Sequence, residues 1–145
     1  MADCKKAKVV HICPTPFGHA VFLKVLRKVF VIYMDKVSSS NLDSAITRQK
    51  SERPTTHDLV MSVLDAVEAK IDKVVIDFEE DGVFQSTMYI TMENEIGKKL
   101  IELDSRPSDA LSFAIRQKAP IYILSDILLR LEDVSELLKE LKEED

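Results

Sequence analysis

A helix begins within the stretch Asp104-Ser-Arg-Pro-Ser-Asp-Ala-Leu111. Ser105 is a suitable N-cap residue, and Pro107 falls in the first turn, where its missing N–H costs nothing. Apolar residues at helical spacing continue to Ala119-Pro120, where the helix should end. Two carboxylates, an arginine and two hydroxyls are therefore gathered at a helix N-terminus, where free N–H groups and the positive end of the helix dipole favour anions.

Arg106 is the unusual residue of this stretch. Capping accounts for Ser105 and for Asp109, whose carboxylate is favoured by about 0.3–1 kcal/mol near the positive end of the dipole. A cation in the same place is disfavoured, so Arg106 needs a partner, which is Asp104, Asp109 or a bound anion. The stretch is therefore either an anion-binding helix start or a conventionally capped one.

A second helix start of the same kind occurs earlier, in Arg53-Pro-Thr-Thr-His-Asp-Leu-Val60. Thr55 and Asp58 have the spacing of a capping box, with Asp in place of Glu or Gln. An apolar stripe of helical period follows. Two conventional caps would explain the hydroxyls and the acids of both stretches, but would leave His57 and the two arginines without a role.

The rest of the chain predicts strands and further helices. Asp81-Gly82 is a hairpin turn between two strands. We expect strands at 8–12, 20–26, 29–34, 74–78, 83–91, 99–103 and 121–124, and helices at 37–50, 126–131 and 134–141. The predicted fold class is α+β, a single domain with a bent, barrel-like mixed β-sheet packed by several helices. We place this domain at 1–131 and an acidic amphipathic C-terminal helix at 132–145, which either docks on its own domain or contacts another subunit of a homo-oligomer.

Composition narrows the possible functions. The chain has 145 residues, a formal net charge of −5 and a pI near 5.3, which argues against a broad basic face that wraps nucleic acid. Any contact with nucleic acid must then come from local patches of basic residues. No apolar run reaches the ~20 residues of a membrane span, no signal peptide is evident, and two cysteines are too few for a disulfide framework, so we expect a cytoplasmic protein without a membrane partner. The candidate basic residues are Lys5, Lys6, Lys8, Lys24, Arg27, Lys28, Arg53 and Arg106.

The two helix starts, together with the Asp-Gly hairpin between them and Ala119-Pro-Ile-Tyr122 after them, resemble the bifunctional nuclease family. The similarity extends from about Val9 to about Leu128. Members of this family are described as cleaving both DNA and RNA. The resemblance therefore implies a nuclease that acts on nucleic acid.

Metal-assisted phosphodiester hydrolysis is the chemistry that these residue types fit best. Mg²⁺ or Mn²⁺ held by carboxylates can activate water and offset the charge of the transition state. We expect Asp104 and Asp109 to bind the metal, with Glu102 as an alternative ligand. His57 and Asp58 are expected to complete the catalytic group. The candidates for phosphate contact are Arg53, Arg106 and Ser108. A single composite site requires the two helix starts to converge in space.

The competing hypothesis is a non-enzymatic binding or assembly domain. In it, Arg106 pairs with Asp104 or Asp109, and Arg53 pairs with Asp58, as structural clamps. Exposure separates the two hypotheses, because catalytic carboxylates face a pocket, whereas clamps are buried and saturated by their own arginines.

Overall fold

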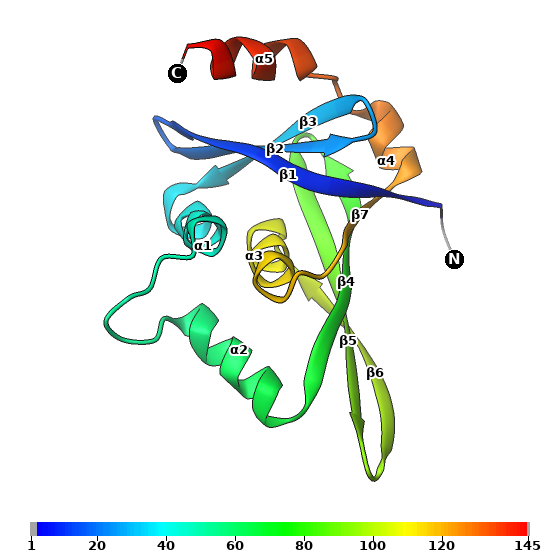
Figure 1. The fold of residues 1–145 in the computed structure, drawn as a ribbon. Helices are drawn as coiled ribbons and strands as arrows, with labels where there is room; N and C mark the ends of the chain where they lie inside the picture. The colour runs from blue at the N-terminus through cyan, green and yellow to red at the C-terminus, as the bar shows by residue number, and fades with distance from the viewer. Residues whose placement is uncertain (1–2, 145) are drawn as a thin grey trace.

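The computed structural model describes residues 3–144, which form one α+β domain (Figure 1). This part of the chain contains seven strands and five helices. The strands are β1 (Cys4–Thr15), β2 (Gly18–Val25), β3 (Lys28–Asp35), β4 (Ala69–Glu80), β5 (Val83–Asn94), β6 (Gly97–Ser105) and β7 (Ile121–Leu124). The helices are α1 (Lys36–Thr47), α2 (Thr56–Ala66), α3 (Pro107–Gln117), α4 (Ser125–Arg130) and α5 (Ser135–Glu143).

The strands form one mixed sheet in the order β3-β2-β1-β7-β4-β5-β6. Two antiparallel meanders, β1-β2-β3 and β4-β5-β6, are joined by the short strand β7, which is antiparallel to β1 and parallel to β4. The single-domain mixed sheet with several helices is as the sequence predicts. The sheet is not closed, however, because β3 and β6 remain as edges, and the expected barrel-like form is therefore not confirmed.

The core lies between the sheet and the helices α1 and α3, which run side by side across one face (Figure 1). On β5 the alternate residues Phe84, Ser86, Met88 and Ile90 are buried, and the residues between them point to the other face. Seven residues of α3 are buried, from Pro107 to Ala114. The start of α3 is consequently held at a fixed place by packing on both the sheet and α1.

The helix α5 packs on the opposite side of β2 and β3. Leu138 contacts the small cluster of Ala20, Phe22 and Val29, and the N–H of Val134 donates to the backbone oxygen of Val29 at 2.8 Å. The amphipathic C-terminal segment thus docks on its own domain, which was one of the two expected outcomes. No helix among residues 3–144 is long and apolar enough to cross a membrane.

The predicted cap of α3 needs correction. Ser105 is the last residue of β6, and its hydroxyl pairs with that of Ser86 at 3.0 Å instead of capping the helix. Arg106 occupies the N-cap position, with no side-chain cap hydrogen bond, and Pro107 is the first helical residue. The sheet register decides this outcome, because Ser105 pairs with Ser86 in the β5–β6 ladder.

Candidate functional site

The starts of α2 and α3 meet at the carboxylate of Asp109. Its Oδ1 lies 3.0 Å from Nε2 of His57, which belongs to the first turn of α2. Its Oδ2 accepts a hydrogen bond of 2.9 Å from Nε of Arg106. This ion pair raises the pKa of Arg106, chiefly through the hydrogen bond that its guanidinium donates to Asp109. The two helix starts therefore do converge, and Asp109 is the residue that joins them.

The start of α1 is the third part of this group. Nη1 of Arg106 donates to the hydroxyl oxygen of Ser38 at 3.1 Å, and that hydroxyl donates to Oδ2 of Asp35 at 2.9 Å. The Ser38 N–H also donates to Asp35, which is the N-cap of α1. These hydrogen bonds, and more weakly the charge of Arg106, lower the pKa of Asp35.

Sequence reasoning missed Asp35 and Ser38. An Asp at the end of a strand, followed three residues later by Ser, is itself a helix-start signal. That signal does not say that the helix start faces Arg106, since only the packing of α1 beside α3 brings the two together.

His57 is held in a closed environment. The residue is 7% exposed, and its ring lies 4.5 Å from the ring of Phe113, centroid to centroid. An ionised carboxylate can only accept, so when the His57 ring is neutral its proton lies on Nε2, and Nδ1 keeps its lone pair. Among residues 3–144, Nδ1 has no hydrogen-bond partner. The histidine is thus oriented by Asp109, with a buried acceptor on its other side.

A second ion pair links α2 to the other end of α3. Nη1 of Arg116 donates to Oδ1 of Asp58 at 2.6 Å. The predicted capping box is present, because Thr55 N–H donates to Oδ2 of Asp58 and Asp58 N–H donates to the hydroxyl oxygen of Thr55. The pKa of Asp58 is lowered, first by the Thr55 N–H and then by Arg116. Asp58 therefore pairs with Arg116 and not with Arg53.

The remaining predicted site residues make no hydrogen bond or ion pair with the Asp109 side chain in the described part of the chain. Asp104 is exposed on β6 opposite Thr87, on the face of the sheet away from buried Ser86. Arg53 is exposed and makes no hydrogen bond or ion pair in the described part of the chain. Ser108 is buried at the second helical position of α3. The structure brings together His57, Arg106 and Asp109, and leaves these three outside.

The donor set around Asp109 does not fit a preformed metal site. Both carboxylate oxygens already face donors of this chain, and Asp104 points to the other side of the sheet. Residues 3–144 contain no group of three His, Cys, Asp or Glu side chains placed to hold a metal ion. The binding of Mg²⁺ or Mn²⁺ by Asp104 and Asp109 stays a prediction.

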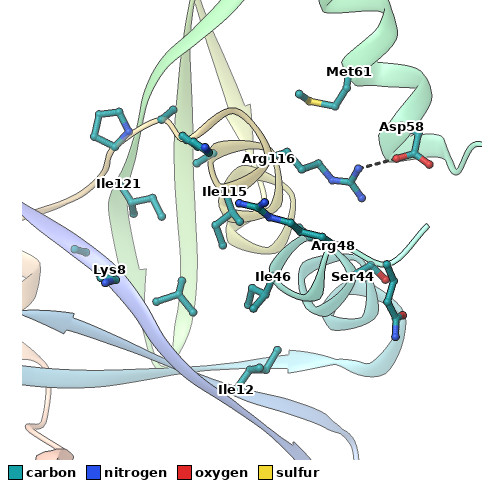
Figure 2. A pocket seen from close by; sticks show the side chains of 18 of the residues that line it. Lys8, Ile12, Ser44, Ile46, Arg48, Asp58, Met61, Ile115, Arg116 and Ile121 are labelled. Carbon is teal, nitrogen blue, oxygen red and sulfur yellow. Dashed lines mark hydrogen bonds and ion pairs between the residues drawn. The ribbon is translucent and has the colours of Figure 1, made fainter. Parts of the chain in front are cut away.

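A groove of about 1580 Å³ adjoins the Asp58–Arg116 pair. It lies between β1, the ends of α1 and α3, the connection from α1 to α2, and α2 itself (Figure 2). Lys6 and Lys8, which the sequence indicated as basic candidates, line it. So do Arg48, Lys50 and Lys118, which the sequence analysis did not single out because they lie in two distant segments, just after α1 and just after α3.

Comparison with known proteins agrees with the resemblance seen in the sequence. Two uncharacterized proteins of Mycobacterium tuberculosis, from strains CDC 1551 and H37Rv, are each 30% identical to this chain over 76 residues. The alignment covers 52% of this chain and 42% of each relative, so this chain matches less than half the length of these relatives. The model of the bifunctional nuclease domain matches residues 21–135, which include α1, α2 and α3 with all of their N-termini. On this match, the chain belongs to the bifunctional nuclease domain family.

Proposed function

We propose that this protein is a nuclease-like hydrolase that cleaves phosphodiester bonds in DNA and RNA at the Asp109 centre. The observation that carries the proposal is the contact of His57 and Arg106 with one carboxylate, at the meeting point of three helix N-termini inside the matched family region. Helix N-termini and arginine both favour a phosphate group.

Each of the three residues has a distinct role in this reaction. Asp109 holds the His57 ring through Nε2, which leaves Nδ1 as the base that takes a proton from the attacking water. The negative charge of Asp109 then stabilises the imidazolium that forms. As the water oxygen bonds to phosphorus, the bond from phosphorus to the sugar oxygen breaks, and the departing oxygen takes a proton from solvent. The side chain of Arg106 is 65% exposed, and its Nη2, which makes no hydrogen bond within residues 3–144, can bind a non-bridging oxygen of a phosphodiester.

Substrate access to His57 requires a local movement. Nδ1 is buried in this conformation, and the His57 ring packs beside Phe113 of α3. The connection from Arg48 to Pro54, just before α2, is exposed and without regular structure apart from turns. The proposal therefore includes a displacement of the first turn of α2 when substrate binds.

The direct experiment is a cleavage assay with highly purified protein and variants. Single-stranded DNA and RNA are incubated with Mg²⁺, with Mn²⁺ and with EDTA. Asp109→Asn keeps the shape of the side chain and removes its charge, and Asp65→Asn, an exposed acid on α2, is the matched control. Cleavage lost in Asp109→Asn and kept in Asp65→Asn supports the proposal. Cleavage that survives in Asp109→Asn contradicts it, and the EDTA arm tests the predicted metal requirement separately.

A second candidate is a non-enzymatic binding or assembly domain, favoured by one specific observation. Both oxygens of Asp109 and both oxygens of Asp58 accept hydrogen bonds within the chain, as structural clamps would. In that case the wild-type protein cleaves neither DNA nor RNA in any arm of the assay, and Asp109→Asn lowers the melting temperature without any change in activity.

A further inference from the structure

The groove beside α2 is basic in a protein that is acidic overall. Apart from Asp58, which is paired with Arg116, its acidic lining residue is Glu52. Five other lining residues are cations whose side chains make no hydrogen bond or ion pair within residues 3–144: Lys6, Lys8, Arg48, Lys50 and Lys118. The whole chain carries −5. A local excess of unpaired positive charge against that background selects an anionic occupant.

The groove also offers apolar and aromatic surface. Figure 2 shows Ile12, Ile115 and Ile121 around its open centre, with the Arg116–Asp58 pair along one side. Tyr122 also lines the groove and is the register partner of Lys6 across the β1–β7 ladder. A cation beside an aromatic ring suits a phosphate followed by a flat base, because bases stack on aromatic side chains in a sequence-tolerant way.

The size of the groove favours a polymer over a small molecule. Its volume of about 1580 Å³ exceeds the roughly 300–1,000 Å³ typical of small-molecule pockets. A duplex keeps its bases inside and would offer only phosphates, leaving the isoleucine and tyrosine surface unused. A single strand can present phosphates to the lysines and bases to the apolar surface at the same time.

We propose that this groove binds a short single-stranded segment of DNA or RNA. The inference deepens the proposed function, on which it rests for its class of substrate, by naming the form of nucleic acid and the surface that holds it. Asp58 connects the two places, since its carboxylate lines the groove and its neighbour His57 contacts Asp109. The strand thereby lies along α2, whose first turn also carries His57 of the Asp109 centre.

The test measures binding apart from cleavage. Fluorescence anisotropy follows a labelled single strand of about twelve nucleotides, and a duplex of the same length, between about 50 and 200 mM salt in EDTA. A gel run afterwards checks that the oligonucleotide is intact. The groove variant is Lys6→Gln, Lys8→Gln and Lys50→Gln combined. The control combines Lys98→Gln, Lys99→Gln and Lys139→Gln, exposed lysines of β6 and α5, and changes the net charge equally.

We expect the groove variant to bind the single strand about tenfold more weakly, with the slope of log affinity against log salt reduced by about 2 for three lost phosphate contacts. The control should bind like the wild type, both variants should melt like it, and the duplex should bind more weakly than the single strand. The proposal is overturned if both variants lose the same affinity for the single strand. It is also overturned if the duplex, or an oligoglutamate peptide, binds more tightly than the single strand. If binding depends on the groove lysines but the protein cleaves neither DNA nor RNA, the nuclease function is refuted and the groove proposal stands. If cleavage depends on Asp109 but KM is the same in the groove variant as in the wild type, the groove proposal is refuted and the nuclease function stands.

Discussion

The two Arg-Pro-hydroxyl helix starts have the same sequence pattern but different structures. In the first, Thr55 is the N-cap, Pro54 lies outside the helix and Arg53 is exposed. In the second, the helix begins two positions earlier within the pattern, so that Arg106 is the N-cap, Pro107 is the first helical residue and Ser108 is buried. Proline is compatible with both positions. The position of the helix boundary therefore decides whether the arginine or the hydroxyl residue occupies the N-cap.

The largest expected effect comes from removing the carboxylate that the second helix start contributes. Asp109→Ala leaves Nε2 of buried His57 without its acceptor and removes the partner of Arg106. We expect the free energy of unfolding to fall by about 2 kcal/mol at pH 7, since hydrogen bonds to charged groups contribute roughly 1.5–3 kcal/mol. Urea denaturation followed by circular dichroism measures this change.

The matched control for this measurement is Asp65→Ala, in an exposed part of α2. Its stability should stay within about 0.5 kcal/mol of the wild type. An equal loss in both variants would show that the contacts of Asp109 with His57 and Arg106 do not stabilise the fold.

The hydroxyl residues give the next largest difference. Thr55→Ala removes the cap of α2 and half of its capping box, and should cost about 1 kcal/mol. Ser108→Ala removes a buried hydroxyl that makes no cap hydrogen bond, and its cost should stay below that of Thr55→Ala. The same denaturation experiment compares the two, and a larger loss for Ser108→Ala would reverse the assignment of the caps.

Most of the fold was predictable because local signals agree with one another. The Asp81-Gly82 hairpin, the capping box of Thr55 and Asp58, and the amphipathic C-terminal helix each follow from turn chemistry or from hydrophobic period. The order of the strands did not follow from these signals, because the placement of β7 between β1 and β4 depends on pairing between distant segments. Local pattern contains no information on which edges of the sheet remain open.

The candidate site was predictable in part for the same reason. The pattern placed His57 and Asp109 at helix starts, but their contact depends on how α2 lies against α3. Asp104 shows that a residue close in sequence to the site need not be close to it in space. It lies close to Asp109 in sequence, yet strand alternation turns it to the other face of the sheet. The cations of the groove come from β1, the end of α1 and the end of α3, and no local motif marks them.

A smaller effect is expected in the pH dependence of stability. The pKa of Asp58 in the folded state is below the ordinary value of 3.8, through Thr55 N–H and Arg116. The unfolded chain therefore binds more protons in acid, so this contribution to stability is complete above about pH 5 and is lost as the pH falls through the folded pKa. Because the side chain is partly exposed, the contribution should stay below about 1 kcal/mol. Melting curves of wild type and Asp58→Asn from pH 7 to pH 3 should converge as the pH falls, and a constant difference would contradict this account.

The smallest effects concern the arginines, and they bear most directly on the comparison of the two helix starts. Arg53→Ala removes an exposed side chain that makes no hydrogen bond or ion pair in the described structure, and should leave stability unchanged. Arg106→Ala breaks an ion pair and the hydrogen bond to Ser38, but this arginine is 65% exposed, so a loss of about 0.5 kcal/mol is expected. The measurement is chemical denaturation at low and high salt. Only the loss in Arg106→Ala should shrink as salt is added, because screening weakens an exposed ion pair and leaves an unpaired side chain unaffected. A salt-dependent loss of stability in Arg53→Ala would mean that Arg53 also forms an ion pair at the first helix start. The two arginines would then have the same role, and the difference between the two helix starts would not hold.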